Sequence, residues 1–218
     1  MKRPDMQIQL RNLIPCYIEK EKRMDSQVWE RNMLIAKGTH LHIVVSSGSG
    51  KTSLIHFIYG LRKDYSGSIF YDDTDIKTLS TEGFSTYRKN KISVVFQDLR
   101  LFQDQSVRDN IEIKRILSPY HDTGSINEMA VKLGIETKLG QLVRTCSYGE
   151  QQRIAIIRAL MQPFDILLLD EPYSHLDDVN RKKAMELIDE ECEKRNAAMV
   201  FVDLKPLDFF KGEKVVYL

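Results

Sequence analysis

No apolar stretch of the 218-residue sequence approaches the roughly 20 residues that a helix needs to cross a lipid bilayer. The N-terminal residues also lack the apolar core of a secretory signal. Composition is otherwise that of an ordinary soluble globular protein, with 42% apolar and 29% charged residues. If the protein acts at a membrane, we therefore expect another polypeptide to supply the membrane-spanning part.

The sequence also has few cysteines and almost no net charge. Cys16, Cys146 and Cys192 are an odd number of cysteines at unrelated spacings, which argues against a disulfide framework or a metal cluster and favours a reducing, cytosolic compartment. The formal net charge is +1, so no overall field favours nucleic acid or an anionic membrane. We expect no nucleic acid partner, although a neutral total leaves room for a local basic patch.

Short apolar segments, most of them rich in β-branched residues, predict a mainly parallel sheet that is covered on both faces. A helical pattern over residues 178–195 separates two of them, and the alternation of strands and helices predicts an α/β fold with right-handed crossovers. The expected strands cover residues 41–45, 92–96, 166–169 and 199–202.

Two further regions complete the predicted architecture. Residues near Ile8 and Leu10, together with residues 33–36, predict an N-terminal antiparallel β subdomain. Residues from about 99 to 146 have fewer β-branched runs and predict an inserted helical lobe, which reaches about residue 160 when the following helix is included. We expect residues 1–218 to form a single domain.

A loop rich in glycine and serine follows the first predicted core strand and leads into a predicted helix over residues 52–59. This strand–loop–helix order predicts a P-loop NTPase-type core, in which backbone N–H groups and the helix N-terminus hold phosphate oxygens. Lys51 would hold the β- and γ-phosphates, and the Thr52 hydroxyl would ligate Mg²⁺. A simple surface turn is the alternative. The residues expected to bind ATP are Ser46, Ser47, Gly48, Ser49, Gly50, Lys51, Thr52 and Ser53.

Val45 departs from the usual pattern of such loops, which has glycine five residues before Gly50. A β-branched residue strongly disfavours positive φ. Either the backbone at Val45 is therefore ordinary, or the loop is altered.

Two other segments carry groups suited to nucleotide chemistry. Asp170 and Glu171 end an apolar strand, where doubly wound sheets place their ligand-binding groups. Ser147 followed by Glu150 is a capping-box pattern, and the helix N-terminus that it begins is also an anion site. Taken alone, the first segment is also compatible with a solvated strand end and the second with a purely structural helix start.

These segments, with Gln97 after its strand and residues 174–177 after the acidic pair, resemble in their order the ATP-binding subunit of ABC (ATP-binding cassette) transporters. The resemblance covers nearly the whole chain and looks closest to the lipoprotein-release, macrolide-export and cell-division-associated branch. It implies an ATPase that uses ATP and Mg²⁺ and works as a homodimer or heterodimer. It also implies that ATP-dependent dimerisation drives or gates a separate integral-membrane permease subunit, with the ATPase in the cytoplasm, peripheral on the inner face of the membrane.

The resemblance implies roles for the polar residues at the strand ends. Asp170 and Gln97 would join Thr52 at Mg²⁺, and Gln97 would also couple the site to the permease. Glu171 would polarise the attacking water, a role worth roughly 10²–10⁴ in rate for a well-placed base.

Ser147 and Gly149 match the family's signature motif, which binds the γ-phosphate of ATP held on the opposite subunit, and Glu150 stands where that motif has glutamine. The resemblance implies that Ser147, Gly149 and Glu150 contact the partner's ATP. Tyr148 replaces a glycine of that motif and would add bulk close to the partner's ATP. Tyr17 lies about where the family has an aromatic ring that stacks on adenine, with core packing as the alternative.

Asp203 occupies a catalytic position at which the family has a histidine that contacts the γ-phosphate. A carboxylate there would repel phosphate, and by analogy with the loss of one transition-state donor hydrolysis would fall by roughly 10²–10³. A shifted alignment is the alternative, but no histidine follows His175. The departures at Val45, Tyr148 and Asp203 motivate the second functional hypothesis, a hydrolysis-impaired, nucleotide-gated regulatory module. A soluble ABC protein acting on DNA or ribosomes is a weaker third.

Overall fold

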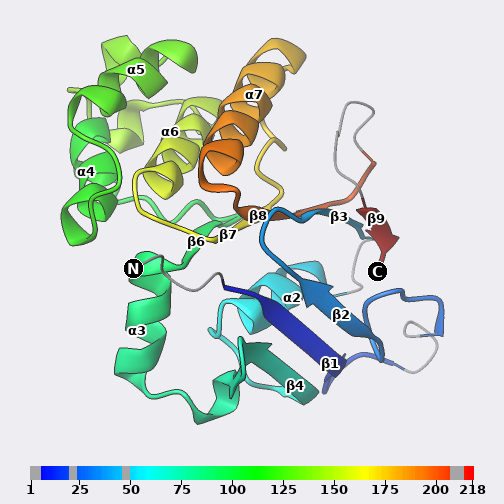
Figure 1. The fold of residues 1–218 in the computed structure, drawn as a ribbon. Helices are drawn as coiled ribbons and strands as arrows, with labels where there is room; N and C mark the ends of the chain where they lie inside the picture. Colours follow the sequence, from blue (N-terminus) through cyan, green and yellow to red (C-terminus); the bar gives the residue numbers. More distant parts are fainter. Residues whose placement is uncertain (1–5, 20–23, 46–49, 207–213) are drawn as a thin grey trace.

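The computed structural model describes residues 6–19, 24–45, 50–206 and 214–218 (Figure 1). Its centre is a five-stranded, fully parallel sheet in which non-consecutive strands are neighbours. The predicted parallel core is confirmed, and the four predicted strands are present with shifts of one residue at some ends. In spatial order the strands are β6 (Ile92–Val95), β7 (Ile166–Asp170), β8 (Ala198–Asp203), β3 (His40–Val44) and β9 (Lys214–Tyr217).

The continuous apolar strands have a simple cause in this sheet, because alternate side chains enter two different cores. Leu167 and Leu169 of β7 belong to the core on the side of the helical lobe. Ile166 and Leu168 of the same strand belong to the core on the opposite face. All five residues of β7 are buried, so the sequence shows no polar alternation.

The opposite face of the sheet is covered by helix α2 (Lys51–Ile58) and by a four-stranded antiparallel sheet (Figure 1). This sheet confirms the predicted N-terminal β subdomain, although its last two strands were not predicted. Its order is β2 (Asn32–Ile35), β1 (Ile8–Pro15), β4 (Tyr65–Tyr71) and β5 (Thr74–Asp75).

Gly67 marks the point where β1 is irregular. The β1–β4 register shifts between Arg11 and Ile14. A Cβ atom on Gly67, which has a φ of 80°, would lie 2.2 Å from the carbonyl oxygen of Asn12. Only glycine allows the two strands to approach so closely here.

The remaining α-helices begin at side-chain caps in most cases. Ser80, Ser106, Ser147 and Asp177 each accept a hydrogen bond from a backbone N–H in the first turn of the helix that follows. Helix α7 has the bounds predicted for it. The helices are α3 (Thr81–Asn90), α4 (Val107–Leu117), α5 (Gly124–Lys132), α6 (Tyr148–Leu160) and α7 (Asp178–Arg195), and 3₁₀ turns cover Ile76–Thr78, Glu136–Lys138 and Val143–Thr145.

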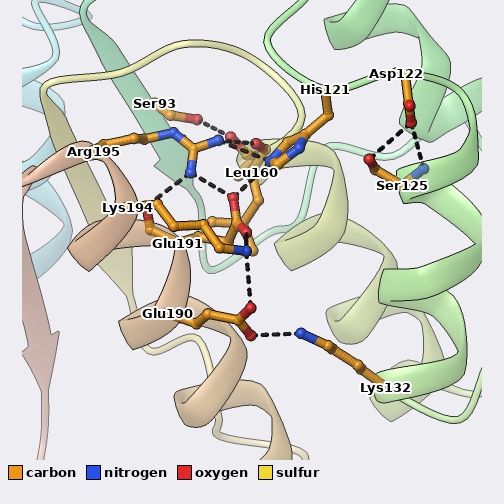
Figure 2. Close-up of polar contacts among 11 residues, drawn as sticks. Ser93, His121, Asp122, Ser125, Lys132, Leu160, Glu190, Glu191, Lys194 and Arg195 are labelled. Carbon is orange, nitrogen blue, oxygen red and sulfur yellow. Dashed lines mark hydrogen bonds and ion pairs between the residues drawn. The ribbon is translucent and has the colours of Figure 1, made fainter.

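Helices α4, α5 and α6 form the predicted helical lobe and lie with α7 on one side of the parallel sheet (Figure 1). Figure 2 shows the polar cluster that joins this lobe to α7. The buried Glu191 of α7 forms a hydrogen-bonded pair with His121, with 2.6 Å between Oε2 and Nε2, and an ion pair with Arg195. Arg195 also donates to the carbonyl oxygen of Leu160 at 3.0 Å. The segment before α5, the end of α6 and the end of α7 are thereby held together.

Among the described residues, no helix is both long and apolar enough to span a lipid bilayer.

Candidate functional site

The carboxyl-terminal edge of the parallel sheet brings the predicted polar residues together. The register pairs Val44 with Asp203 and Asp170 with Val202, so strands β3, β7 and β8 end at the same level. Lys51 begins the helix that follows β3, and its charge acts on both Asp170 and Asp203. Residues far apart in the sequence therefore share one polar edge.

Four side chains of this edge form a continuous chain of contacts. The Lys51 ammonium is ion-paired with the Glu171 carboxylate. Gln97 Nε2 donates to the other carboxylate oxygen of Glu171 at 3.2 Å, and Thr52 Oγ1 donates to Gln97 Oε1 at 3.3 Å. The predicted phosphate, magnesium and water-activating residues thus lie in one cluster.

Glu171 is held in an unusual backbone conformation. Its φ is 46°, in the left-handed region that a non-glycine residue rarely occupies. Its N–H donates to the carbonyl oxygen of Val202 at 3.0 Å, and its own carbonyl oxygen accepts from Gln152 Nε2 at 3.0 Å and from Ser174 Oγ at 3.2 Å. These bonds fix the direction in which the carboxylate leaves the strand end.

Gln152 is a site residue that sequence reasoning missed. Its side chain is buried, and its Oε1 accepts from the backbone N–H of His175 at 3.1 Å while its Nε2 supports Glu171. No spacing in the sequence marked this amide as buried, although a buried amide must find hydrogen-bond partners. Gln152 therefore connects the signature helix α6 to the loop after β7.

Asp170 has the properties of a cation ligand. Its side chain is only 1% exposed, and neither carboxylate oxygen has a hydrogen-bond partner among the described residues. Burial raises its pKa to about 6, although the nearby Lys51 charge opposes this shift. Hard oxygen donors suit Mg²⁺, so the two orphaned oxygens, beside the Thr52 hydroxyl and the Gln97 amide, fit this ion.

Asp170→Asn is expected to stabilise the protein at neutral pH when Mg²⁺ and nucleotide are absent. The folded-state pKa of about 6 lies above the ordinary aspartate value of 3.8, so ionised Asp170 opposes folding. This cost is absent below about pH 4 and grows until the pH passes about 6, reaching on the order of 3 kcal/mol at about 1.4 kcal/mol per pKa unit. Urea unfolding should show a stability gap between variant and wild type that widens from pH 4.5 to pH 7.5. Asp73→Asn, at an exposed carboxylate, is the control. If the stability difference between Asp170→Asn and the wild type stays the same over this pH range, the raised pKa of Asp170 is wrong.

Asp203 lies at the end of β8 beside the cluster. Its side chain accepts from the Leu204 N–H at 2.6 Å, and its carbonyl oxygen accepts from the Val45 N–H at 2.9 Å. Burial raises the pKa of Asp203, while the Leu204 N–H and the Lys51 charge oppose the rise. A carboxylate therefore stands at the strand end where the family pattern has histidine.

The loop before α2 is described only at its two ends. Val45 is buried and is not among the described residues with positive φ, so its backbone is ordinary. Ser46, Ser47, Gly48 and Ser49 lie outside the described residues. Gly50 has a φ of 99°, and a Cβ atom there would lie 2.8 Å from Ile18 Cδ1 and 3.2 Å from Trp29 Cζ2. Glycine is therefore required at this position.

An open groove of about 440 Å³ lies beside the start of α2. Tyr17, whose ring is half-exposed, stands in its lining, and its hydroxyl donates to Ser53 Oγ. Arg62, which sequence reasoning missed, donates to the same oxygen at 2.8 Å, with its guanidinium 5.1 Å from the centre of the Tyr17 ring. The groove is lined by Tyr17, Gly50, Lys51, Thr52, Ser53, Arg62 and Gln97.

The signature segment begins α6 with the predicted capping box. The Ser147 N–H donates to Glu150 Oε2 at 2.7 Å, and the Glu150 N–H donates to Ser147 Oγ at 3.3 Å. A Cβ atom on Gly149 would lie 2.9 Å from the carbonyl oxygen of His175, so the glycine allows close backbone contact. The helix start is thereby packed against the loop that follows Glu171.

Tyr148 points into its own chain. Its hydroxyl donates to the carbonyl oxygen of Gln97 at 3.1 Å, and its ring lies 4.3 Å from the His175 ring between centroids. It lines a hollow of about 280 Å³ together with Thr52, His56, Phe96, Gln97, Asp98 and Asp170. Its side chain therefore belongs to the site of the same chain.

Comparisons with known proteins agree with this geometry. The family model described as ABC transporter matches residues 30–174. The lipoprotein-releasing system ATP-binding protein LolD of Syntrophotalea carbinolica is 30% identical over 93% of this chain and 90% of its own length. LolD of Buchnera aphidicola subsp. Schizaphis graminum is 32% identical over 89% and 86%.

Two further similarities concern larger or structurally known proteins. The macrolide export ATP-binding/permease protein MacB of Campylobacter fetus is 34% identical over 72% of this chain, which spans 25% of that protein. Among solved structures, the dimeric post-hydrolysis state of the ATP-binding cassette MJ0796 bound to ADP and Pi is similar, with a TM-score of 0.83. The identity is 26%, over 97% of this chain and 94% of the other.

Proposed function

Because this chain belongs to the ABC transporter family, as an ATP-binding subunit with ATPase activity, we propose that it drives or gates a separate integral-membrane permease. It would act from the cytoplasm, on the inner face of the membrane, as one of two ATPase subunits that dimerise on ATP. Residues 1–218 would act as one domain, with the helical lobe over about 99–160. The similarity to LolD over nearly the whole chain supports this division of labour.

ATP would bind in the groove beside α2. The half-exposed ring of Tyr17, which lines this groove together with Arg62, would stack on adenine. Lys51 would exchange its partner Glu171 for the β- and γ-phosphates, since a phosphate carries more negative charge than a carboxylate. The loop residues Ser46, Ser47, Gly48, Ser49 and Gly50, with Thr52 and Ser53, would donate to the phosphate oxygens.

Thr52, Gln97 and Asp170 would hold Mg²⁺, which neutralises charge on the phosphates when it is bound. The orphaned oxygens of Asp170 carry this assignment. Once Lys51 turns to phosphate, Glu171 would be free to accept a proton from the attacking water. Gln97 is already hydrogen-bonded to both Thr52 and Glu171. It would therefore hold the attacking water and the cation at fixed positions relative to each other.

We base the proposal that the site is shared between two subunits on the acidic side chain of Asp203. At the end of β8 the chain offers a carboxylate, which cannot donate to the γ-phosphate unless it is protonated. The exposed Ser147 and the N-terminus of α6 are donors of the kind needed. In a dimer these donors would come from the second subunit, together with Gly149 and Glu150.

Of the three departures that motivate the hydrolysis-impaired module, Asp203 is the one that places a carboxylate beside the cluster. Two observations support hydrolysis instead. One is the contact cluster of Lys51, Gln97 and Glu171, and the other is the buried Asp170, whose carboxylate oxygens fit a cation. ATP-driven transport is therefore the preferred function.

Ser147→Asp is expected to abolish ATP-dependent dimerisation while ATP binding to the monomer is retained. Aspartate caps helices as well as serine does, so α6 should still form, but the new charge would face the partner's γ-phosphate. Ser147→Asn, a neutral cap, is the matched control, and Gly149 is avoided because any side chain there presses on His175. Light scattering after size exclusion, with ATP and the Glu171→Gln exchange in every sample, gives the dimer fraction. An intact dimer in the Ser147→Asp sample would refute the shared site.

A further inference from the structure

Tyr148 connects the signature segment to the catalytic cluster of its own chain. The side chain reaches 3.1 Å from the Gln97 carbonyl oxygen and is braced edge-to-face, at 65°, by the His175 ring. Glycine, the residue of the family pattern at this position, makes neither contact. The two contacts are therefore properties of this chain in particular.

The segment that contains Gln97 is attached to α6 at a second point. Leu99 and Arg100 have φ values of 57° and 49°, so the chain turns sharply just after Gln97. Arg158 of α6 donates to the carbonyl oxygens of both residues, at 2.5 Å to Leu99 and 2.7 Å to Arg100. Tyr148 at the first residue of α6 and Arg158 farther along it hold residues 97–100 against the helix.

The side chain of Gln97 is bound to the other half of the molecule. Thr52 of α2 and Glu171 after β7 hold its side-chain amide, and both lie at the carboxyl-terminal edge of the parallel sheet. Gln97 is thus held by its side chain from the core and by its main chain from the helical lobe. A displacement of α6 would move Tyr148, and through its hydrogen bond to the main chain of Gln97 it would also shift the side-chain amide of that residue.

We propose that Tyr148 is a positioning residue that couples the placement of the helical lobe to the Gln97 amide in the same subunit. The proposal rests on the role assigned above to Gln97. Tyr148 itself touches neither phosphate nor cation in this role. It limits the movement of the Gln97 amide, which lies between Thr52 and Glu171.

Tyr148→Phe keeps the ring against His175 and removes only the hydroxyl donor. Loss of one neutral hydrogen bond predicts a fall of roughly 2- to 10-fold in kcat. The KM for ATP should stay unchanged, because the lost bond goes to Gln97 and not to Tyr17 or Lys51, the groove residues proposed to hold adenine and phosphate. Tyr148→Gly, which removes the ring as well, should lower kcat at least as much. Tyr120→Phe is the matched control, since Tyr120 is similarly exposed and lines neither hollow at the site.

ATP binding can be followed separately from turnover. Trp29 is the single tryptophan of the chain and lies beside Gly50, so its fluorescence reports occupancy of the groove. A purely structural role of Tyr148 would shift the thermal midpoint or the KM, whereas the positioning role leaves both in place.

A double-mutant cycle with Gln97→Ala decides between the outcomes. If Tyr148 acts through the Gln97 amide, Tyr148→Phe should cause no further loss of kcat once the amide is gone. Additive losses, or a wild-type kcat for Tyr148→Phe, would overturn the positioning role while a deficient Gln97→Ala still upholds the proposed site. Full activity of Gln97→Ala would instead refute the role of Gln97, and the coupling with it.

Discussion

Replacing Glu171 by glutamine is expected to lower the turnover number for ATP by roughly 10²–10⁴. The amide has nearly the same shape, so the contact with Gln97 can persist and the backbone bonds to Val202 and Gln152 remain. What is lost is the ability to accept a proton from water. The defect should therefore lie in the chemical step.

ATP affinity should be retained or increased in the same variant. Glu171 is the ion-pair partner of Lys51, and a neutral side chain no longer competes with phosphate for that ammonium. Phosphate release in steady state gives turnover, and Trp29 fluorescence gives binding. Glu186→Gln, at an exposed position on α7, is the control. Turnover near the wild-type value would mean that another group activates the water.

Asp203→His is expected to raise turnover, by up to roughly 10²–10³ if a missing γ-phosphate donor limits the rate. The side chain lies at the end of β8, at the level of the Lys51 and Asp170 charges. Exchange for histidine removes a repulsive carboxylate and adds an N–H donor. The exchange removes the hydrogen bond that the Asp203 carboxylate accepts from the Leu204 N–H at the surface end of the strand, so the fold should tolerate the change.

Asp203→Asn separates the two causes of that gain. Asparagine removes the charge and supplies a shorter donor, so a rise in both variants points to repulsion and a rise with histidine alone points to donor placement. Both variants are measured by phosphate release under saturating Mg-ATP, with thermal unfolding as the check on folding. If neither exceeds the wild type, Asp203 does not limit hydrolysis, and the signature segment of the second subunit is sufficient.

The secondary structure of the core was predictable because its causes are local or periodic. Strand β7 is apolar at nearly every position, and Asp177 and Asn196 cap α7 at its two ends, the latter with a φ of 49°. The later strands of the antiparallel sheet were missed. Strand β4 contains Ser66, Gly67 and Ser68, which weaken a strand pattern, and its pairing with β1 depends on contacts across the sequence.

The residues of the candidate site likewise fall into those that were predicted from the sequence and those that were not. Position in the chain pointed to Lys51, Asp170 and Glu171, because each stands at the end of a recognisable strand or the start of a helix, and parallel strands bring such ends to one edge. Gln97 was predicted only from the resemblance to the family. Gln152 and Arg62 were not predicted as site residues, since a buried amide and a half-buried guanidinium carry no positional pattern.

The sequence by itself determined the α/β class, through its apolar periodicity, and the groups expected at the sheet edge. It indicated the family through motifs whose order resembles that of ABC ATP-binding subunits. Only the tertiary structure decided which partners those groups have. It pairs Lys51 with Glu171, leaves Asp170 without a hydrogen-bond partner among the described residues, and turns Tyr148 toward its own Gln97. The physical reason is that such contacts depend on how the helical lobe packs on the sheet. This packing is the sum of many long-range contacts, none of which is encoded in any one segment.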